Sequence, residues 1–241
     1  MKDYTLKYGK GSVTFALDEA HVTELYGTPV PKIDDIRAAL YATLSSPVSH
    51  EPLESWVNPG DKVALIVSDM SRFWMRQDLV VPHIISYLTD KCDVNQNNIT
   101  IIIANGTHPG GDENELRTLV TDGVYDRIRV VNHDCQAKDL VYIGTTSLGT
   151  EVRINPIAEN ADKVIMLGAC TYHVMAGYGG GRKSILPGIS GLETIRQNHL
   201  HSLDLLAPRS NPLIGNGVPD GNPLNEDLCQ AAAMVQTAIG H

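Results

Sequence analysis

The stretch KVALIVSD at residues 62–69 decides the fold, because it is a short, β-branched apolar run that ends in a carboxylate. Unbroken apolar runs of this length are typical of strands that are buried on both faces of a parallel sheet. Three further runs have the same character, namely ITIIIANG at 99–106, IRVVNHD at 128–134 and DKVIMLGA at 162–169. The sequence therefore predicts a mainly parallel sheet.

Segments with a helical spacing of apolar residues lie between and after these runs. We expect helices over residues 32–44, 79–92, 112–120, 191–203 and 225–239. One face of the first helix carries Ile33, Ile36, Leu40 and Leu44. Pro82 is tolerable only in the first turn of the second helix. Strands that alternate with helices predict an α/β fold with a Rossmann-like sheet flanked by helices.

Two hairpins and a linker-like loop complete the organisation. Residues 4–17 alternate around Gly9 and Gly11, which predicts an N-terminal hairpin, and residues 140–155 predict another hairpin. The segment 207–225 is rich in Gly, Pro and Asn and leads into the terminal helix at 225–239. We expect residues 1–241 to form one cofactor-binding and catalytic domain.

Composition and charge exclude several classes of protein. The formal net charge is -9 and no run of Lys and Arg occurs, which argues against a nucleic-acid partner. No stretch approaches 18 apolar residues, so we expect no membrane span. The N-terminus has no apolar signal core. Four widely spaced cysteines, at 92, 135, 170 and 229, predict free buried thiols and a cytoplasmic location.

Polar and titratable residues follow all four apolar runs. Ligands of parallel α/β sheets bind outside the carboxyl ends of the strands, so these residues predict a site at one edge of the sheet. The residues concerned are Asp69, Ser71 and Arg72; Asn105, Gly106, Thr107 and His108; Asn132, His133 and Asp134; and Thr171, Tyr172 and His173.

A glycine-rich segment, HVMAGYGGGRKSILPG at residues 173–188, follows the fourth run. It differs from the Walker pattern, because Gly177 lies six residues before Lys183 and Tyr178 interrupts the glycines. Binding of a nucleoside triphosphate is therefore weakly supported. A lysine on such a loop suits a phosphate contact or a covalent link to a cofactor, and we expect its side chain to be exposed.

Several of these residues also have purely structural interpretations. His108 could cap a loop, Asp69 and Arg72 could form a surface ion pair, and we expect His133 to bond a neighbouring turn. His199 and His201 are two residues apart, so on a helix they face different directions and do not bind one ion together. Imidazoles otherwise suit nickel, copper or zinc, or proton transfer near neutral pH.

Four segments in order along the chain resemble the nickel-pincer lactate racemase family, which includes other 2-hydroxyacid racemases and epimerases. They are DMSR at 69–72, NGTH at 105–108, YHVMAGYGGGRKSILPGISG at 172–191, and NH at 198–199. The resemblance implies an isomerase that acts on a small, lactate-like 2-hydroxyacid by hydride transfer. It also implies a covalently bound cofactor, pyridinium-3,5-bisthiocarboxylic acid mononucleotide, which holds nickel and is made by separate maturation enzymes.

The resemblance implies a role for each matching residue. Lys183 would hold the cofactor covalently and His199 would bind nickel, while His108 and His173 would act as paired acid and base. Arg72 would bind the substrate carboxylate, and Asp69 would hold the cofactor or orient Arg72. The segment that includes Ser184, Pro187 and Gly188 would lie along the mononucleotide phosphate.

Members of this family continue into a second domain, which we expect to be absent from this chain. The isolated chain would then turn over poorly or not at all.

Two alternatives remain open on the residues alone. One is a non-catalytic module that binds a mononucleotide or metal. The other is a zinc hydrolase that uses His108, His173 and His199, although no HExxH-like carboxylate base accompanies them.

Overall fold

A computed structural model describes residues 1–240 of the chain. The chain divides into two compact units, of which the first is Met1–Asp34 and the second starts at Asp35. The first unit contains the predicted antiparallel hairpin, β1 (Lys2–Tyr8) and β2 (Gly11–Leu17), followed by the short helix η1 (Glu19–His21). Gly9 makes the turn with a φ of 57°.

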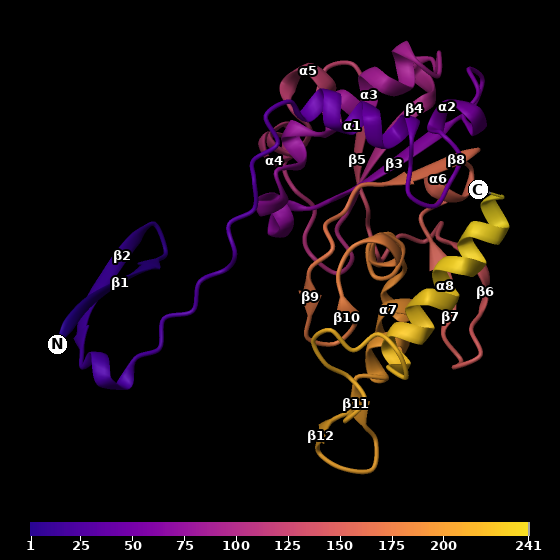
Figure 1. Ribbon diagram of the computed structural model, residues 1–241. Coiled ribbons are helices and arrows are strands. Elements are labelled where there is room, and N and C mark those ends of the chain that lie inside the picture. The colour runs from indigo at the N-terminus through magenta and orange to yellow at the C-terminus, as the bar shows by residue number, and fades with distance from the viewer. Residues whose placement is uncertain (241) are drawn as a thin grey trace. The chain divides into compact units, whose positions relative to one another are not determined.

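The second unit is built on a four-stranded parallel sheet, as the sequence predicts (Figure 1). Its strands lie in the order β5 (Arg129–Asn132), β4 (Ile99–Ala104), β3 (Val63–Ser68) and β8 (Lys163–Met166). Three parallel pairings connect them, including Leu65 with Ile101 and Leu65 with Ile165. The four runs picked out from the sequence are therefore the four strands.

Both faces of the sheet are buried, which explains why the strands are apolar without alternation. Leu65 and Val67 pack into one core and Ala64 and Ile66 into the other, and all four are at most 1% exposed. Figure 1 shows α1 and α3 on one side of the sheet and α7 and α8 on the other.

The elements of each side contribute to a separate core. The first comprises α1 (Ile36–Ser45), α2 (Leu53–Trp56), α3 (Val81–Asp90), α4 (Glu113–Val120) and α5 (Asp122–Tyr125). The second comprises the predicted hairpin β6 (Val141–Thr145) and β7 (Glu151–Ile154), with α6 (Pro156–Glu159), α7 (Leu192–Leu200) and α8 (Pro223–Ile239). The short elements between them are η2 (Met70–Met75), η3 (Gln77–Leu79), η4 (Gln96–Asn98), β9 (Tyr172–His173), β10 (Gly177–Tyr178), η5 (Gly181–Ser184), β11 (Leu203–Asp204) and β12 (Arg209–Ser210).

Capping residues set the helix starts. The side chain of Asp112 accepts a hydrogen bond from the Glu115 amide at the start of α4, and Pro82 lies in the first turn of α3. The predicted helix at 32–44 begins later than expected, because Asp35 caps α1. Ile33 therefore precedes the helix and is 64% exposed, so its placement on the apolar face was wrong.

The loop over residues 207–225 lies within the second unit, whereas the division between compact units falls after Asp34. One hydrogen bond that holds the loop in place runs from Asn222 Nδ2 to the Met175 carbonyl, at 2.8 Å.

All four cysteines are free, as expected, but Cys170 and Cys229 are exposed rather than buried. Among the described residues no helix is long and apolar enough to cross a membrane.

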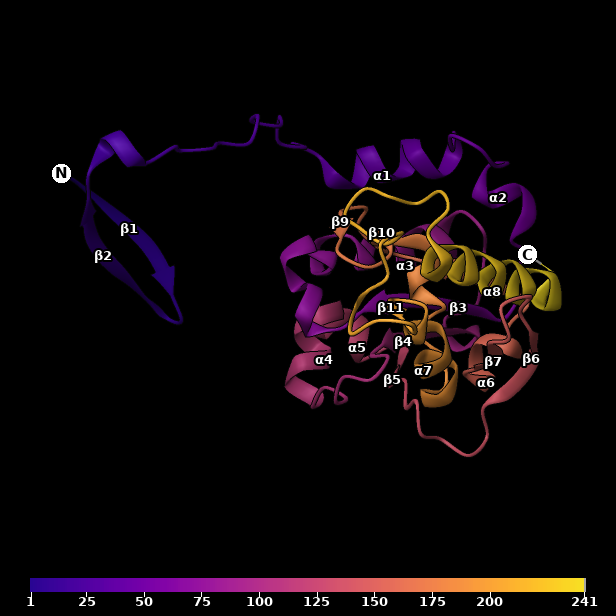
Figure 2. The ribbon, with the colours of Figure 1, turned by 90° about the horizontal axis from the view of Figure 1, so that it is seen from below.

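The strand order positions the site. From β3 the chain moves to β4 and β5 on one side (Figure 2). Strand β8 is added on the other side of β3 (Figure 1). The connections that leave the ends of β3 and β8 therefore diverge and leave a crevice beyond the sheet. Open α/β sheets bind ligands at such a switch point.

Candidate active site

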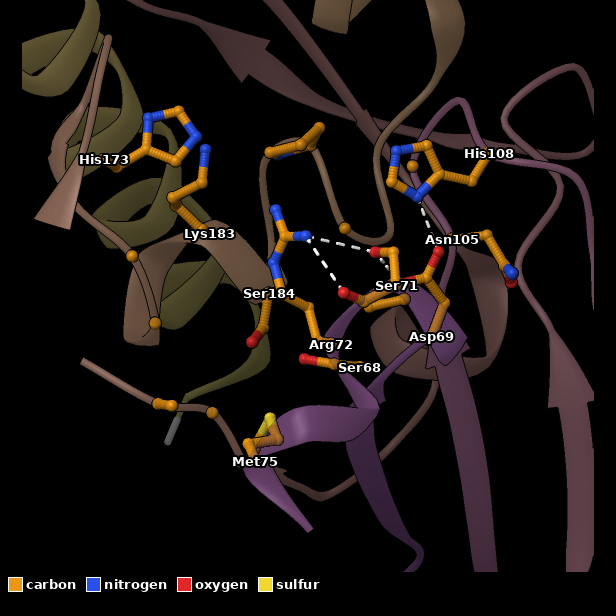
Figure 3. Close-up of a pocket in the computed structure, with 18 of the residues that line it drawn as sticks. Ser68, Asp69, Ser71, Arg72, Met75, Asn105, His108, His173, Lys183 and Ser184 are labelled. Atoms are coloured by element: carbon orange, nitrogen blue, oxygen red, sulfur yellow. Dashed lines mark hydrogen bonds and ion pairs between the residues drawn. The ribbon is translucent and has the colours of Figure 1, made fainter. Parts of the chain in front are cut away.

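A cavity of about 370 Å³ lies at this edge of the sheet (Figure 3). The segments that follow β3, β4 and β8 line it, together with the glycine-rich segment and α7. All of the residues to which the family resemblance assigns a role lie in its wall: Asp69, Arg72, His108, His173, Lys183, Ser184, Pro187, Gly188 and His199. Convergence of these residues on one cavity was expected from the strand ends.

The end of β5 does not reach the cavity, which corrects the prediction that all four strand ends contribute. Asn132 instead accepts a hydrogen bond from the Gly111 amide at 3.1 Å. His133 is buried, with Nε2 2.9 Å from the Ser190 carbonyl and Nδ1 3.2 Å from Asn155 Nδ2. Burial lowers the pKa of His133, which keeps the ring neutral. The physical reason is position, because β5 is an outer strand away from the switch point.

His108 and Asp69 form a hydrogen-bonded pair. The distance from His108 Nδ1 to Asp69 Oδ2 is 2.6 Å, and Ser71 Oγ donates to the other carboxylate oxygen at 2.6 Å. A carboxylate only accepts, so Nδ1 carries the proton and Nε2 of the neutral ring keeps its lone pair. In Figure 3 this second nitrogen faces the cavity. The geometry makes Nε2 of His108 a proton acceptor backed by a negative charge.

Arg72 is not paired with Asp69, so the surface ion pair considered from the sequence is not formed. Within residues 1–240 its guanidinium group donates only to Ser71, at 3.2 Å to Oγ and 3.4 Å to the carbonyl. Asp69 therefore reaches Arg72 only through Ser71. Figure 3 shows Arg72 between His108 and His173. An exposed fork in this position can bind a carboxylate with two parallel hydrogen bonds.

His173 has the opposite arrangement of its ring nitrogens. Its Nδ1 lies 3.2 Å from the Met175 amide nitrogen and 3.1 Å from the Ala176 amide nitrogen. An amide N–H only donates, so Nδ1 is the acceptor and the proton of the neutral ring sits on Nε2. Burial, followed by the positive charges of Lys183 and Arg72, lowers the pKa of His173 to about 4. His173 is therefore neutral near physiological pH.

His199 and His201 lie in different environments, as their spacing predicts. His199 Nδ1 donates to the Ile195 carbonyl at 2.8 Å, so Nε2 is left with its lone pair at the cavity. Burial lowers the pKa of His199, which favours the neutral, ligating form. His201 lines a separate cavity, and its Nε2 lies 3.8 Å from Asp227 Oδ2.

Lys183 is partly buried rather than exposed, which corrects the expectation from the sequence. Burial and then the charges of Arg182 and Arg72 lower the pKa of its amine to about 8. Gly180 has a φ of 76°, and a side chain there would bring Cβ to 2.8 Å from the Ala169 carbonyl oxygen. Glycine at this position therefore allows the lysine segment to pack against the end of β8.

The described residues contain no group of three or more His, Cys, Asp or Glu side chains that could hold a metal ion. The zinc-hydrolase interpretation, which needs three protein ligands, is therefore not supported. A metal bound at His199 would take its other ligands from a bound group. His199 Nε2 and the weakly basic amine of Lys183 both fit a cofactor that brings its own metal ligands.

The large apolar residues of the wall, Trp74, Met75 and Ile195, were missed from the sequence. A search for titratable groups at strand ends passes over apolar side chains. Trp74 is 57% exposed at the cavity, and an exposed tryptophan two residues after Arg72 is the signal that could have been used.

A family model described as the lactate racemase N-terminal domain matches residues 8–209. The chain is 27% identical to the lactate racemase of Thermoanaerobacterium thermosaccharolyticum, over 99% of this chain and 55% of that protein. It is 26% identical to the lactate racemase of Lactiplantibacillus plantarum, over 97% of this chain and 54% of that protein. The chain thus spans about half the length of these relatives.

Two solved structures also match the chain. The lactate racemase apoprotein from Thermoanaerobacterium thermosaccharolyticum matches with a TM-score of 0.82 and 25% identity, over 97% of this chain and 54% of that one. A protein from Thermotoga maritima matches with a TM-score of 0.65 and 20% identity, over 85% of this chain and 48% of that one. The second match supports the fold alone.

We predict that the Lys183 amine reacts with an acylating reagent with a pH midpoint near 8, instead of its ordinary 10.5, because burial disfavours the charged form. The rate of modification of the peptide that carries Lys183 is measured by mass spectrometry across neutral and alkaline pH. The same peptide in the urea-unfolded chain is the control. Coincident midpoints in the folded and unfolded chains would contradict the buried environment of this amine.

Proposed function

The chain belongs to the lactate racemase N-terminal domain family, and on this premise we propose that it forms the cofactor-binding and catalytic part of a racemase or epimerase. The substrate class is a small 2-hydroxyacid such as lactate. The chain spans about half the length of its relatives, and the activity is proposed for the whole protein that contains these residues.

The proposed cofactor is nickel held by pyridinium-3,5-bisthiocarboxylic acid mononucleotide and linked covalently to Lys183. The lowered pKa of Lys183, about 8, gives a substantial fraction of neutral amine for bond formation. His199 Nε2 would be the protein ligand of nickel, a metal that imidazole and sulfur donors suit. Ser184, Pro187 and Gly188 line the same wall and would lie along the phosphate.

When bound, this group would accept the α-hydrogen of the substrate as hydride. Removal of the same hydrogen as a proton would place a second negative charge beside the carboxylate. Arg72 would bind that carboxylate with its guanidinium fork. His108 Nε2 would take the hydroxyl proton, and Asp69 would stabilise the resulting imidazolium. The planar keto acid could then present its other face, where His173 would serve the opposite enantiomer.

The observation that carries the proposal is the His108–Asp69 pair at 2.6 Å, with Arg72 between it and His173 (Figure 3). A module that only binds a mononucleotide or metal has no need of an imidazole backed by a carboxylate. This pair therefore favours catalysis over the binding-module alternative.

Maturation enzymes would supply the cofactor. The absence of any paired cysteine among the described residues suits a cytoplasmic protein.

The proposal is tested on the full-length protein from a host that has the maturation enzymes. We expect the peptide with Lys183 to carry the mass of one sulfur-containing mononucleotide, with about one nickel per chain. Lys183→Ala should lose the added mass. His199→Ala should keep the added mass and lose most of the nickel, whereas His201→Gln, two residues away, should keep both. An unmodified wild-type peptide would refute the covalent cofactor.

In the same loaded protein we predict that Asp69→Asn lowers kcat about 10²-fold with little change in KM, because the imidazolium of His108 loses its negative partner. The fall in kcat/KM must be equal in both directions, since two enantiomers have equal free energy. Asp78→Asn is the matched control, because Asp78 pairs with Arg76 at 2.8 Å outside the cavity wall. Unchanged kcat in Asp69→Asn would remove the dyad from the mechanism.

A further inference from the structure

The three cavity histidines present different ring nitrogens to the cavity. His108 and His199 each donate a hydrogen bond through Nδ1, to Asp69 and to the Ile195 carbonyl, so each keeps a lone pair on Nε2. His173 accepts hydrogen bonds at Nδ1 and carries its proton on Nε2. The two histidines proposed as acid and base are therefore not equivalent. The Nε2 atom of His108 can accept a proton directly, whereas the Nε2–H of His173 can only donate a hydrogen bond.

One of the two N–H groups that donate to His173 Nδ1 belongs to the peptide between Met175 and Ala176. The N–H of this peptide donates to His173 Nδ1 at 3.1 Å. Its carbonyl, on Met175, accepts a hydrogen bond from Asn222 Nδ2 at 2.8 Å. Both ends of the peptide are thus fixed, and its N–H is held toward the ring.

Arg182 holds the next peptide of the same loop. Its Nη2 donates to the Ala176 carbonyl at 3.0 Å, and its Nε donates to Asn225 Oδ1 at 2.7 Å. Asn225 is in the first turn of α8, and its amide is capped by Asn222 Oδ1 at 3.1 Å. Asn222 is fully buried. The start of α8 is therefore connected to His173 through Asn222 and Arg182, neither of which lines the cavity.

We propose that Asn222 and Arg182 are positioning residues that hold His173 as a neutral hydrogen-bond donor in the substrate-free chain. An imidazolium has protons on both nitrogens, and a proton on Nδ1 would meet the two amide N–H groups. His173 can therefore take up a proton only when the ring and the N–H groups of Met175 and Ala176 move apart.

This inference rests on the proposed function only for the role of His173 in catalysis. In that reaction the hydroxyl proton of the first enantiomer passes to His108, whose Nε2 is ready to accept it. His173 takes from solvent the proton that it gives to the keto oxygen, and the N–H groups of Met175 and Ala176 decide when it can do so, while His108 releases its proton to solvent.

The test is ring ¹⁵N NMR of the histidine-labelled 241-residue chain without cofactor, followed through a pH titration. His173→Gln assigns the signals. In the wild-type chain we expect His173 to be protonated on Nε2 alone and to titrate at a pKa of about 4. A wild-type His173 that carries its proton on Nδ1 at neutral pH would overturn the proposal.

Two variants separate the effect of the hydrogen bonds made by Asn222 and Arg182 from the effect of the surrounding charges. Asn222→Ser keeps a side-chain oxygen to cap α8 but loses the donor to Met175, and Arg182→Lys keeps the positive charge but loses the fork. The charged or titratable groups that face His173, namely Arg72, Arg182, Lys183 and His199, keep their charges in both variants. We expect the pKa of His173 to rise by about one unit in each.

The matched control is Asn155→Ser. Asn155 caps α6 with Oδ1, and its Nδ2 donates to His133 Nδ1 at 3.2 Å. This variant should alter the His133 signals and leave those of His173 unchanged. An unchanged pKa of His173 in the folded Asn222 or Arg182 variant would overturn the proposal. Because the titration needs no cofactor, its outcome is independent of the mass and nickel test.

Discussion

The reversal of strand order beside β3 is the constraint on which the rest of the site depends. Parallel strands that are buried on both faces have no free surface for a ligand along their length. The ligand must therefore lie beyond their carboxyl ends, where the connections from β3 and β8 diverge. Asp69 and Arg72 follow β3, His108 follows β4, and His173 follows β8. The outer strand β5 is followed by His133, which is buried and bonds the Ser190 carbonyl instead of lining the cavity.

Within the cavity, the hydrogen-bond partner of each imidazole decides what the imidazole can do. A carboxylate at His108 and a carbonyl at His199 each fix the proton on Nδ1 and leave Nε2 as base or ligand. Two amide N–H groups at His173 fix the reverse arrangement. One residue type thus presents an Nε2 lone pair at His108 and His199 and an Nε2–H at His173 in the same cavity, and the hydrogen-bond partners of Nδ1 fix this difference.

The fold and most of the wall could be predicted from the sequence, because apolar runs and the residues after them are local signals. The four strands, the N-terminal hairpin and the cavity residues from Asp69 to His199 follow from those signals and from the family resemblance. We expected His133 to bond a neighbouring turn, and it bonds the Ser190 carbonyl. The outer position of β5 and the partial burial of Lys183 could not be predicted, because strand order and loop packing are long-range properties.

The positioning roles proposed for Asn222 and Arg182 could not be predicted from the sequence either. Asn222 falls in a segment that has the composition of a linker, and its contact with Met175 spans 47 positions. Arg182 stands next to Lys183 and suggests a phosphate contact, but its guanidinium group binds carbonyls and Asn225. No local pattern distinguishes these uses of an amide or a guanidinium group.

We propose that the cavity histidines have different roles and that His199 alone binds the metal. X-ray absorption at the nickel edge of the loaded full-length protein tests this claim most directly. The account predicts one imidazole nitrogen among the nickel ligands, accompanied by sulfur donors from the bound group. Two or more imidazole ligands would contradict it, because His108 or His173 would then be a ligand rather than an acid–base group.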